Sequence, residues 1–448
     1  MSTGRGRFTS RAGFVLAAAG SAVGLGNIWG FPTQVVSNGG GAFVLVYLLL
    51  TFGLAYPALM AELIIGRFAG ANVVTALQKI QPEGAGRKFG YVIATASIIA
   101  ACLILSFYAI VAGWLLAFLA ASVVDLVGVS TNWLIEESQG RNLLFTGLFY
   151  ISTIVIVARG IEAGIERASK ILMPLLLGLL IALTAYVLTL AGAGEGLVVY
   201  LSPNFSQIVD PGLLISALGQ AFFSLSLGVG GMLIYGSYLD KEENLPAVGA
   251  LVTLTDSSIA FLAGLLILPA IYVAEYRGLT VFSADGSIAA GPDLAFVVFP
   301  PLFDSMGIIG LLIGLAFFAL MSIAALTSSI AMLEVPVSLL VEKKAVSRTA
   351  AAVASGAVVF LVSAAIIFQF DLLFDFVIRL TTQYSVPLIS VGFCIFATWL
   401  WSRNTALSEI QQGFPDAASS FFWKVWPWYA KFLCPLLIAA VFIQSIAG

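Results

Sequence analysis

Long apolar stretches separated by short polar ones run along the whole chain. Apolar runs of 18 or more residues recur throughout the 448 residues, and about 20 residues of helix are needed to cross the hydrocarbon core of a bilayer. The pattern therefore predicts an all-α polytopic membrane protein with about 11 transmembrane helices. We expect the spans at residues 12–36, 41–66, 89–123, 142–158, 167–190, 212–238, 245–275, 306–341, 347–368, 371–402 and 425–446.

The composition narrows the chemistry. Hydrophobic residues make up 60% of the chain and charged residues only 10%, with a formal net charge of −3, so we expect neither a soluble fold nor a nucleic-acid partner. The chain has no histidine, which excludes histidine-based metal sites and catalytic triads and makes a membrane enzyme the least favoured function. The three cysteines (Cys102, Cys394 and Cys434) lie within apolar runs, where they are expected to act as small buried side chains.

The basic residues predict the orientation. With the N-terminus inside, 17 of the 20 Lys and Arg residues fall in inner segments, and only Arg141, Arg277 and Arg379 lie outside. This asymmetry predicts a multi-pass protein of the plasma (bacterial inner) membrane with a cytoplasmic N-terminus. An odd number of spans then places the C-terminus on the extracytoplasmic side. The basic start of the chain carries no small-residue cleavage site, so no signal peptide is expected.

Two apolar runs are interrupted by residues that disfavour a helix. Residues 20–27, in the first span, read Gly-Ser-Ala-Val-Gly-Leu-Gly-Asn, and residues 223–231, in the sixth, read Phe-Ser-Leu-Ser-Leu-Gly-Val-Gly-Gly. Glycine inside a helix costs about 1 kcal/mol relative to alanine, and a backbone group freed within the bilayer needs a partner. A bound cation and an anionic ligand are such partners, although glycines in membrane helices also serve close packing.

The positions of the two breaks predict an internal repeat. Five spans separate corresponding features, and an odd number inverts the second half relative to the first, as in a 5+5 inverted-repeat transporter with broken helices 1 and 6. The expected domains are a cytoplasmic N-terminal segment (1–10), a first repeat with helices 1–5 (11–190), an extracellular loop (191–211), an inverted second repeat with helices 6–10 (212–402), and helix 11 with the C-terminus (403–448).

Several polar side chains lie within the predicted spans. Thr327 and Ser328 in span eight either bond their own helix backbone or offer oxygen ligands to a cation. Glu62 and Asp256 are the deepest acids, and ionisable groups within a membrane are rare and usually functional. Further polar positions in or near the spans are Asn27, Gln220, Glu334 and Asp375.

Specific motifs connect these features to a known family. The first span and its sequel contain Arg11-Ala12-Gly13-Phe14, Gly24-Leu25-Gly26-Asn27-Ile28-Trp29, Phe31-Pro32 and Asn38-Gly39-Gly40-Gly41-Ala42-Phe43, and further motifs occupy residues 62–67, 159–166, 220–228, 291–296 and 326–329. To about residue 400 the chain resembles the bacterial branch of the neurotransmitter:sodium symporter family. That family is itself an example of broken helices and inverted repeats. The resemblance implies sodium-coupled amino-acid uptake by alternating access.

The resemblance also implies the site residues. The first sodium site would use Ala22, Asn27, Ser224 and Thr255, together with the carboxylate of the substrate. The second would use Gly20, Val23, Ala324, Thr327 and Ser328. The substrate site would comprise Ala22, Gly24, Leu25, Gly26, Ile104, Tyr108, Phe223, Ser226, Val229, Ser328 and Met332. A half-helix N-terminus near Leu25 would favour the carboxylate electrostatically.

The gates depart from the family pattern at the outer end. Members usually carry Arg or Lys just before the Phe-Pro of the first span, where this chain has Gly30, although the acid that it would pair with is present as Asp375. We hypothesise that Arg379 takes part of the missing role; a wider or differently charged entrance is the alternative. At the inner end, Arg5 and Glu342 would form the gate pair, with Phe8 and Tyr238 packed nearby.

The pocket residues favour a neutral, hydrophobic amino acid as the substrate. Val229 and the adaptable Met332 leave space for a medium to large side chain, and Asp256 would supply the negative charge that chloride provides in animal members, so no chloride requirement is expected. Two alternatives stay open: a symporter for another small zwitterion, such as a β- or γ-amino acid, and a transport-dead sensor or channel with this fold. The expected partners are the substrate and the lipid bilayer, and a monomer should suffice for transport.

Overall fold

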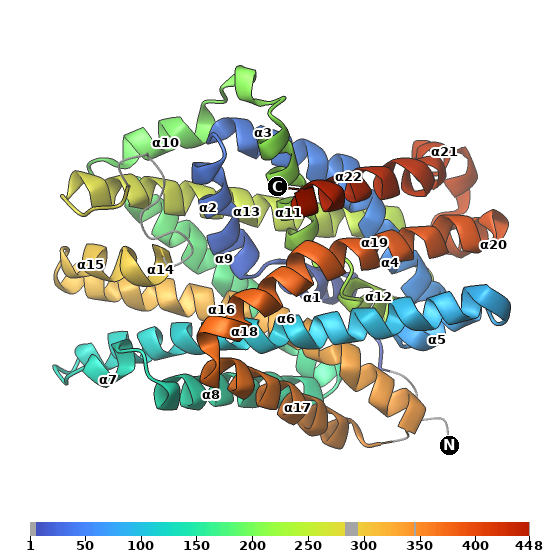
Figure 1. Ribbon diagram of the computed structural model, residues 1–448, viewed down its shortest axis with the longest axis horizontal. Helices are drawn as coiled ribbons and strands as arrows, with labels where there is room; N and C mark the ends of the chain where they lie inside the picture. Colours follow the sequence, from blue (N-terminus) through green and yellow to red (C-terminus); the bar gives the residue numbers. More distant parts are fainter. Residues whose placement is uncertain (1–5, 283–293, 345, 448) are drawn as a thin grey trace.

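The computed structural model describes residues 6–282, 294–344 and 346–447, without the side chains of 294, 344 and 441–447. These residues form helices and connecting segments, and the one β-bridge among them is isolated, between Gly40 and Pro203. The predicted all-α fold class is therefore confirmed. Figure 1 shows that most helices run along the long axis of the molecule, as expected for a bundle that crosses a membrane.

The first half of the bundle contains the elements α1 (Arg11–Ala22), η1 (Gly26–Gly30), α2 (Phe31–Ser37), α3 (Gly41–Leu50), η2 (Thr51–Ala55), α4 (Tyr56–Ala69), α5 (Val73–Ile80), α6 (Gly84–Asp125), α7 (Asn132–Ile135), α8 (Gln139–Ala158), η3 (Ile161–Glu166) and α9 (Arg167–Val187). The connecting segment to the second half contains α10 (Ala193–Leu201) and η4 (Phe205–Gln207).

The second half contains α11 (Pro211–Ser224), α12 (Gly231–Gly236), α13 (Leu245–Tyr276), α14 (Leu294–Val297), α15 (Phe299–Asp304), α16 (Ile308–Lys344), α17 (Arg348–Phe368), α18 (Phe370–Ile378), η6 (Arg379–Ser385), α19 (Val386–Ile395) and η7 (Phe396–Leu400). The remainder forms α20 (Arg403–Gln411), η8 (Pro415–Ser419), α21 (Phe421–Trp428), η9 (Tyr429–Leu433) and α22 (Cys434–Ala447).

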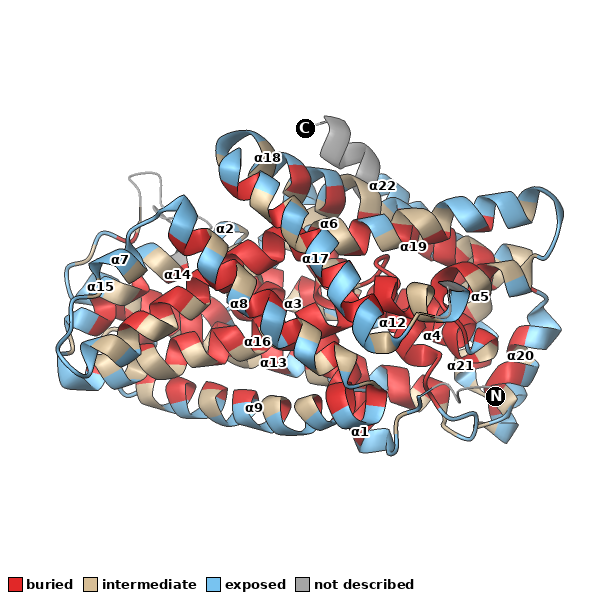
Figure 2. Cartoon of the chain, turned by 90° about the horizontal axis from the view of Figure 1, so that it is seen from below, coloured by how far each residue is buried: buried red, intermediate tan, exposed pale blue. Residues whose placement is uncertain are grey.

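The helices account for the predicted spans. In the described part of the chain, eight helices are long and apolar enough to cross a membrane, and α1 with η1–α2 forms a ninth crossing bent by 56°. The other two predicted spans correspond to the interrupted pair α11 and α12 and to the continuous run α21–η9–α22. Figure 2 places the buried residues along the middle of the bundle and the exposed ones on its periphery. Exposed apolar side chains such as Leu175, Ile181 and Val358 suit contact with lipid.

The first break follows from its sequence. The Ser10 hydroxyl caps the start of α1 by accepting from the Gly13 amide at 3.0 Å. The helix ends at Ala22, and Val23 has an extended backbone with ψ of 106°. A Cβ on Gly24 would lie 2.5 Å from the Ser328 hydroxyl, and one on Gly26 would lie 2.7 Å from the Phe223 ring. These glycines therefore allow two other helices to approach the break.

The second break uses left-handed backbone positions. Helix α11 begins after Asp210, whose carboxylate accepts from the Leu213 amide, and ends at Ser224. Beyond it, Ser226, Gly228 and Gly230 have φ of 52°, 80° and 75°. Ser226 is the only non-glycine residue with positive φ among the described residues. Residues other than glycine that adopt this backbone conformation often lie at functional sites. Both predicted breaks are thus real interruptions near the middle of the bundle.

Candidate functional site

The two breaks face each other across a buried cavity. The Ser226 hydroxyl donates to the Ser21 carbonyl at 3.1 Å, and the Gln220 amide donates to the Gly26 carbonyl at 2.9 Å, so each break holds the other. The residues that line the cavity are Ala22, Gly24, Leu25, Gly26, Ile104, Tyr108, Phe223, Ser226, Leu227, Val229, Ser328, Met332 and Val386. All eleven residues predicted for the substrate site are brought together here. Leu227 and Val386 were not predicted, because neither carries a distinctive side chain.

One end of the cavity presents backbone amides and a hydroxyl. The Leu25 amide donates to the Tyr108 hydroxyl at 3.3 Å, and the Gly24 amide donates to the Asn27 side chain at 3.2 Å. The half-helix η1–α2 begins directly after these residues. Backbone amides, a tyrosine hydroxyl and the partial positive charge of a helix start together suit a carboxylate.

Asn27, Ser224 and Asp256 form the first polar cluster. The Asn27 amide nitrogen donates to Asp256 Oδ1 at 2.7 Å and to Ser224 Oγ at 2.9 Å, and Ser224 Oγ donates to Asp256 Oδ2 at 2.7 Å. All three side chains are buried, and Tyr47 adds a hydroxyl contact to Ser224 at 3.2 Å. Asp256 forms no ion pair with the Lys and Arg side chains that the structure describes. Oxygen ligands around a buried carboxylate of this kind suit a hard cation.

Thr255 does not join this cluster, which corrects the sequence prediction. Its hydroxyl bonds its own helix at the Leu251 carbonyl, 2.8 Å away, and its side chain is partly exposed. Successive residues on a helix point about 100° apart, so Thr255 and Asp256 of α13 face different surroundings. Asp256 occupies the place that the resemblance assigned to its neighbour, and the cluster therefore contains a carboxyl group.

The second polar cluster joins α1 to α16. The Ser328 hydroxyl reaches the Val23 carbonyl at 3.1 Å and the Gly20 carbonyl at 3.5 Å, while the Thr327 hydroxyl contacts the Ala324 carbonyl at 3.0 Å. A Cβ on Gly20 would lie 3.3 Å from the Thr327 side chain. The five residues predicted for the second sodium site are therefore together, as an uncharged set of carbonyls and hydroxyls.

Neighbouring polar groups have structural partners. The hydroxyls of Ser329 and Thr153 bond each other at 2.8 Å, which ties α16 to α8. Glu62 of α4 accepts from the Gly228 amide at 2.7 Å and is buried. Glu62 thus satisfies one backbone group that the second break sets free.

Comparisons with known proteins agree with this geometry. A model described as the Sodium:neurotransmitter symporter family matches residues 5–142 and 135–448. The chain belongs to this family. An "Uncharacterized sodium-dependent transporter YhdH" of Bacillus subtilis (strain 168) is 34% identical over 98% of this chain and 97% of its own length. The crystal structure of MhsT in complex with L-phenylalanine is 38% identical, with a TM-score of 0.84 over 99% of this chain and 100% of MhsT.

More distant relatives cover less of the chain. The "Sodium- and chloride-dependent taurine transporter" of Rattus norvegicus is 29% identical over 66% of this chain and 54% of its own length. Membership in the family makes the protein a sodium-dependent symporter embedded in a membrane. The predicted family and the transport class are therefore confirmed.

The end of the bundle that the sequence predicts to face the cytoplasm, called the inner end below, contains an ionic network around the buried Glu334 that the sequence prediction missed. The Tyr238 hydroxyl donates to Glu334 at 2.6 Å, and Glu334 forms an ion pair with Arg348 at 2.5 Å. Arg348 also donates to the Val157 carbonyl at 2.8 Å, and the Phe8 ring packs against Tyr238 with centroids 6.4 Å apart. An acid in a predicted span needs a partner, so the sequence could have indicated this network through Glu334. Its partner Arg348 is the first residue of the next helix, α17.

The predicted gate pair lies partly outside the described residues. Arg5 is not among them, so its pairing with Glu342 stays a prediction. The Glu342 carboxylate accepts from the backbone and side-chain nitrogens of Asn72 at 2.8 and 2.7 Å. This contact places Glu342 at the start of α5.

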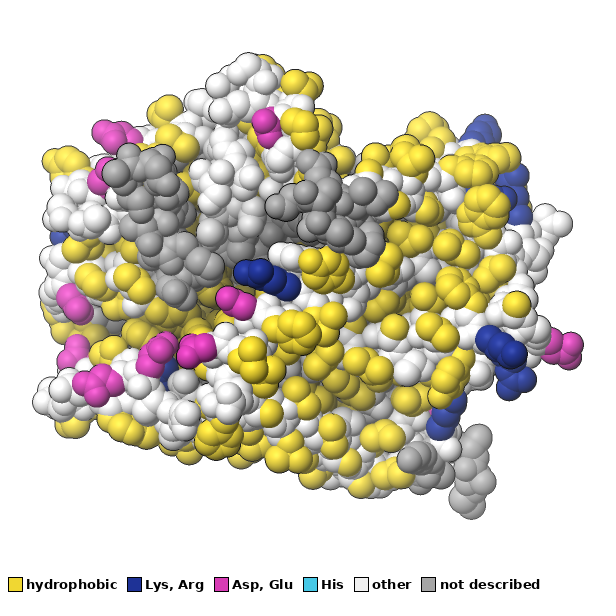
Figure 3. All heavy atoms as spheres, viewed as in Figure 1, with side chains coloured by type: hydrophobic (Ala, Val, Ile, Leu, Met, Phe, Trp, Pro, Cys, Tyr) yellow, Lys and Arg dark blue, Asp and Glu magenta, His cyan; other side chains and the backbone are white. Residues whose placement is uncertain are grey.

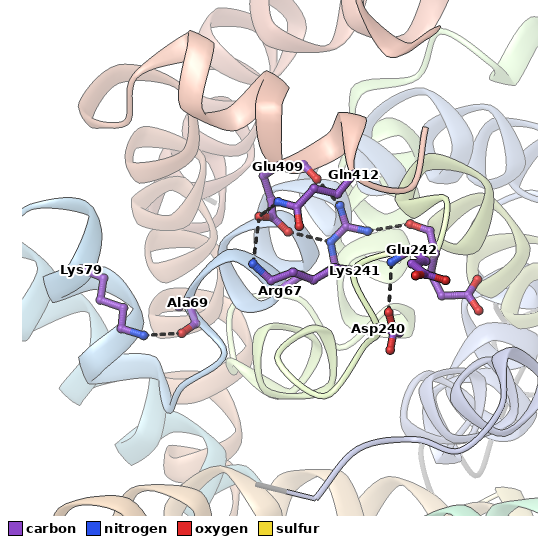
Figure 4. A network of polar contacts seen from close by, with 9 residues as sticks. Arg67, Ala69, Lys79, Asp240, Lys241, Glu242, Glu409 and Gln412 are labelled. Atoms are coloured by element: carbon purple, nitrogen blue, oxygen red, sulfur yellow. Dashed lines mark hydrogen bonds and ion pairs between the residues drawn. The ribbon is translucent and has the colours of Figure 1, made fainter. Parts of the chain in front are cut away.

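A second buried pair holds α20 against the bundle (Figure 4). The Arg67 guanidinium lies 2.8 Å from the Glu409 carboxylate and donates to the Glu243 carbonyl at 2.6 Å, and both charged side chains are buried. Arg11 of α1 reaches the Glu243 carboxylate at 3.8 Å. The segment between α12 and α13 therefore connects the start of α1 with α4 and α20.

At the opposite end, which is predicted to face outside and is called the outer end below, aromatic side chains pack against one another. Phe296 of α14 packs against Trp29, Trp114 and Phe118, with centroids 6.1, 5.7 and 5.4 Å apart. Asp375 and Arg379 are both exposed, and neither forms an ion pair with another described residue. The structure thus does not join the two residues predicted for the outer gate, and a role for Arg379 in that gate stays a prediction.

Proposed function

We propose that this protein takes up a neutral, hydrophobic amino acid together with sodium by alternating access, without a need for chloride. The main support is the buried Asp256 carboxylate, which bridges Asn27 and Ser224 beside an uncharged cavity. The cavity lies between the two helix breaks, as expected for a substrate site near the middle of the bilayer.

The cavity lining supports an apolar substrate side chain. None of the described residues that line it is Asp, Glu, Lys or Arg, and its Ser226 and Ser328 hydroxyls donate to backbone carbonyls. The lining also includes the apolar side chains of Val229, Met332 and Val386. A charged or strongly polar side chain would lose its hydration without a partner. MhsT, which matches the whole chain, was solved with L-phenylalanine, and this favours an α-amino acid over the β- or γ-type alternative.

Two sodium ions would bind at the two polar clusters. Ala22, Asn27, Ser224 and Asp256 would hold the first together with the substrate carboxylate, and the Gly20, Val23 and Ala324 carbonyls with the Thr327 and Ser328 hydroxyls would hold the second. If the substrate carboxylate binds the first ion, each ligand raises the affinity for the other by the same factor. The sodium gradient can then drive uptake.

A thermal-shift screen of the purified protein tests the substrate and the coupling together. A ligand that binds only the native state stabilises it by RT ln(1 + [L]/Kd). We expect hydrophobic amino acids to raise Tm in sodium but not in potassium. An equal rise in potassium would contradict coupling, and a rise with γ-aminobutyrate or taurine alone would favour the other substrate class.

Chloride independence is tested by replacing chloride with gluconate. Uptake by the wild type should not change, because Asp256 supplies a fixed negative charge beside the first ion. The variant Asp256→Asn removes that charge, so its residual uptake should depend on chloride. Thr255→Ala is the matched control on the same helix, and it should leave uptake and its ion dependence unchanged. Loss of wild-type uptake in gluconate would refute the proposal.

The orientation follows from the distribution of charge. On the face in Figure 3, Lys and Arg side chains gather towards the right-hand end and acids towards the left-hand end. The right-hand end carries α20 and the start of the described chain (Figure 1). By the positive-inside rule, this distribution supports the right-hand end as the cytoplasmic one, and the C-terminus would then lie outside. Reporter fusions at the two termini, active on opposite sides of the membrane, test this.

A further inference from the structure

A pocket outside the transport site lies between the inner ends of the last two spans. Its walls come from η7 and the residue after it, from α20, and from α21 with η9, and its volume is about 230 Å³. It is lined by Ala397, Thr398, Trp401, Arg403, Ala406, Trp423, Trp426, Pro427, Trp428 and Lys431. Neither break, neither polar cluster and neither gate contributes to it.

Two cations stand at this pocket without acidic partners. The Arg403 guanidinium lies over the Trp423 ring at 5.7 Å, and the Lys431 ammonium lies over Trp399 at 4.4 Å. Within residues 6–282, 294–344 and 346–440, no carboxylate pairs with either cation. Their positive charge is therefore available to an anion, while cation–π contacts hold their positions.

The pocket walls are fixed by hydrogen bonds. The Trp426 indole donates to the Pro57 carbonyl at 2.9 Å, which anchors α21 to α4. The Trp399 indole donates to the Lys431 carbonyl at 2.9 Å, which ties η7 to η9. The site is thus built from both spans before any ligand binds, and preorganisation of this kind lowers the cost of binding.

An apolar groove continues from the pocket along the outside of the last span. It is lined by Val425, Trp428, Tyr429, Phe432, Leu433 and Leu436, and it shares Trp428 with the pocket. Phe432 is 48% exposed and Leu436 64% exposed. A ligand that fits both parts has an anionic head and an apolar chain.

We propose that this pocket and groove bind one anionic phospholipid of the inner leaflet. The headgroup phosphate lies between Arg403 and Lys431, and one acyl chain follows the groove past Phe432. Basic pockets between spans at the cytoplasmic face recognise such headgroups, and tryptophans favour the membrane interface. The lipid would bridge η7 and η9, and so brace the end of span ten against span eleven. This site does not depend on the proposed substrate or ion stoichiometry.

The test uses the purified full chain in detergent. Phosphatidylglycerol and phosphatidylcholine with the same acyl chains are added separately, and Tm and the lipid retained in native mass spectrometry are measured. We expect phosphatidylglycerol to raise Tm and to be retained, and phosphatidylcholine to do neither. The double variant Arg403→Gln/Lys431→Gln should bind phosphatidylglycerol about 30-fold more weakly, since each basic residue near a membrane surface contributes about 1 kcal/mol.

Lys424→Gln is the matched control, because Lys424 is exposed on α21 and does not line the pocket. It should keep the wild-type response. Equal responses to the two lipids, or an unchanged response in the double variant, would overturn the proposal. An equal response to glycerol 3-phosphate would show a site for free anions instead. If the double variant does not fold, a lack of preference for phosphatidylglycerol in the wild type still overturns the proposal.

Discussion

The two ends of the bundle are held together by different kinds of contact, ionic at one end and aromatic at the other. At the inner end, ion pairs with buried carboxylates join separate helices: Glu334 with the half-buried Arg348, and Glu409 with the buried Arg67. At the outer end, Phe296 packs on Trp29 and Trp114, and the position before Phe31-Pro32 is Gly30 rather than a cation. The difference shows that this symporter has directional ionic contacts at one end of the bundle and apolar contacts at the other.

This contrast predicts that the inner and outer ends of the bundle respond differently to substitutions. Displacing one partner of a buried ion pair is costly, because the charge that remains is buried without a partner and without water. The edge-on and tilted ring contacts around Phe296 lose contact area gradually, and their attraction is insensitive to salt. We therefore expect inner opening to be more sensitive to single substitutions than outer opening. The variants below test that comparison in order of decreasing effect.

The largest effect is expected for Arg348→Gln at the inner end. This change leaves the fully buried Glu334 without its ion pair, and breaking such a pair costs about 3–5 kcal/mol. Tm should fall and uptake should be mostly lost. The double variant Glu334→Gln/Arg348→Gln removes both charges, and it should recover most of the stability. A double variant no more stable than Arg348→Gln would show that the charge is not the cause.

A smaller effect is expected for Phe296→Ala at the outer end. The change removes three ring contacts, each worth about 0.5–1.5 kcal/mol beyond its buried area. Bound substrate should dissociate about tenfold faster, as measured by chase of radiolabelled substrate from proteoliposomes or detergent. Phe296→Leu should recover part of the slow rate. A dissociation rate unchanged in Phe296→Ala would place the outer closure elsewhere.

Gly30→Ala should be tolerated. A Cβ at Gly30 meets no atom closer than 3.8 Å, and alanine stabilises a helix by about 0.5–1 kcal/mol relative to glycine. We expect a slightly higher Tm and wild-type uptake. A marked loss of uptake would mean that the outer end needs a flexible backbone at this position, and not merely the absence of a cation.

The smallest change in stability is expected for Arg379→Ala. Exposed charge pairs contribute about 0–1 kcal/mol, and Arg379 is exposed without an ion pair among the described residues. If Arg379 contributes to the outer gate, uptake should fall by no more than about fivefold. Uptake equal to that of the wild type would remove Arg379 from the gate and leave the ring closure alone.

Much of the site could be predicted from the sequence: the two breaks from local composition, and the site residues from the family resemblance. The glycine-rich breaks at 20–27 and 223–231 appear as real interruptions, and the residues expected around the cavity and the second cluster do come together. Backbone breaks and hydroxyl pairs are local features, since the cost of unwinding a helix is written in its own residues. Their positions in two matching spans also indicated the arrangement of the halves.

The sequence by itself determined the number of spans, the two breaks and the family. Only the tertiary structure decided that Asp256, and not Thr255, faces Asn27, because one residue changes the direction of a side chain on a helix by about 100°. It also decided that Glu334 meets Arg348 and that Arg67 meets Glu409, 342 residues further on. Both pairs join side chains on different helices. Such pairs form only when the helices pack together, and no local sequence pattern encodes them.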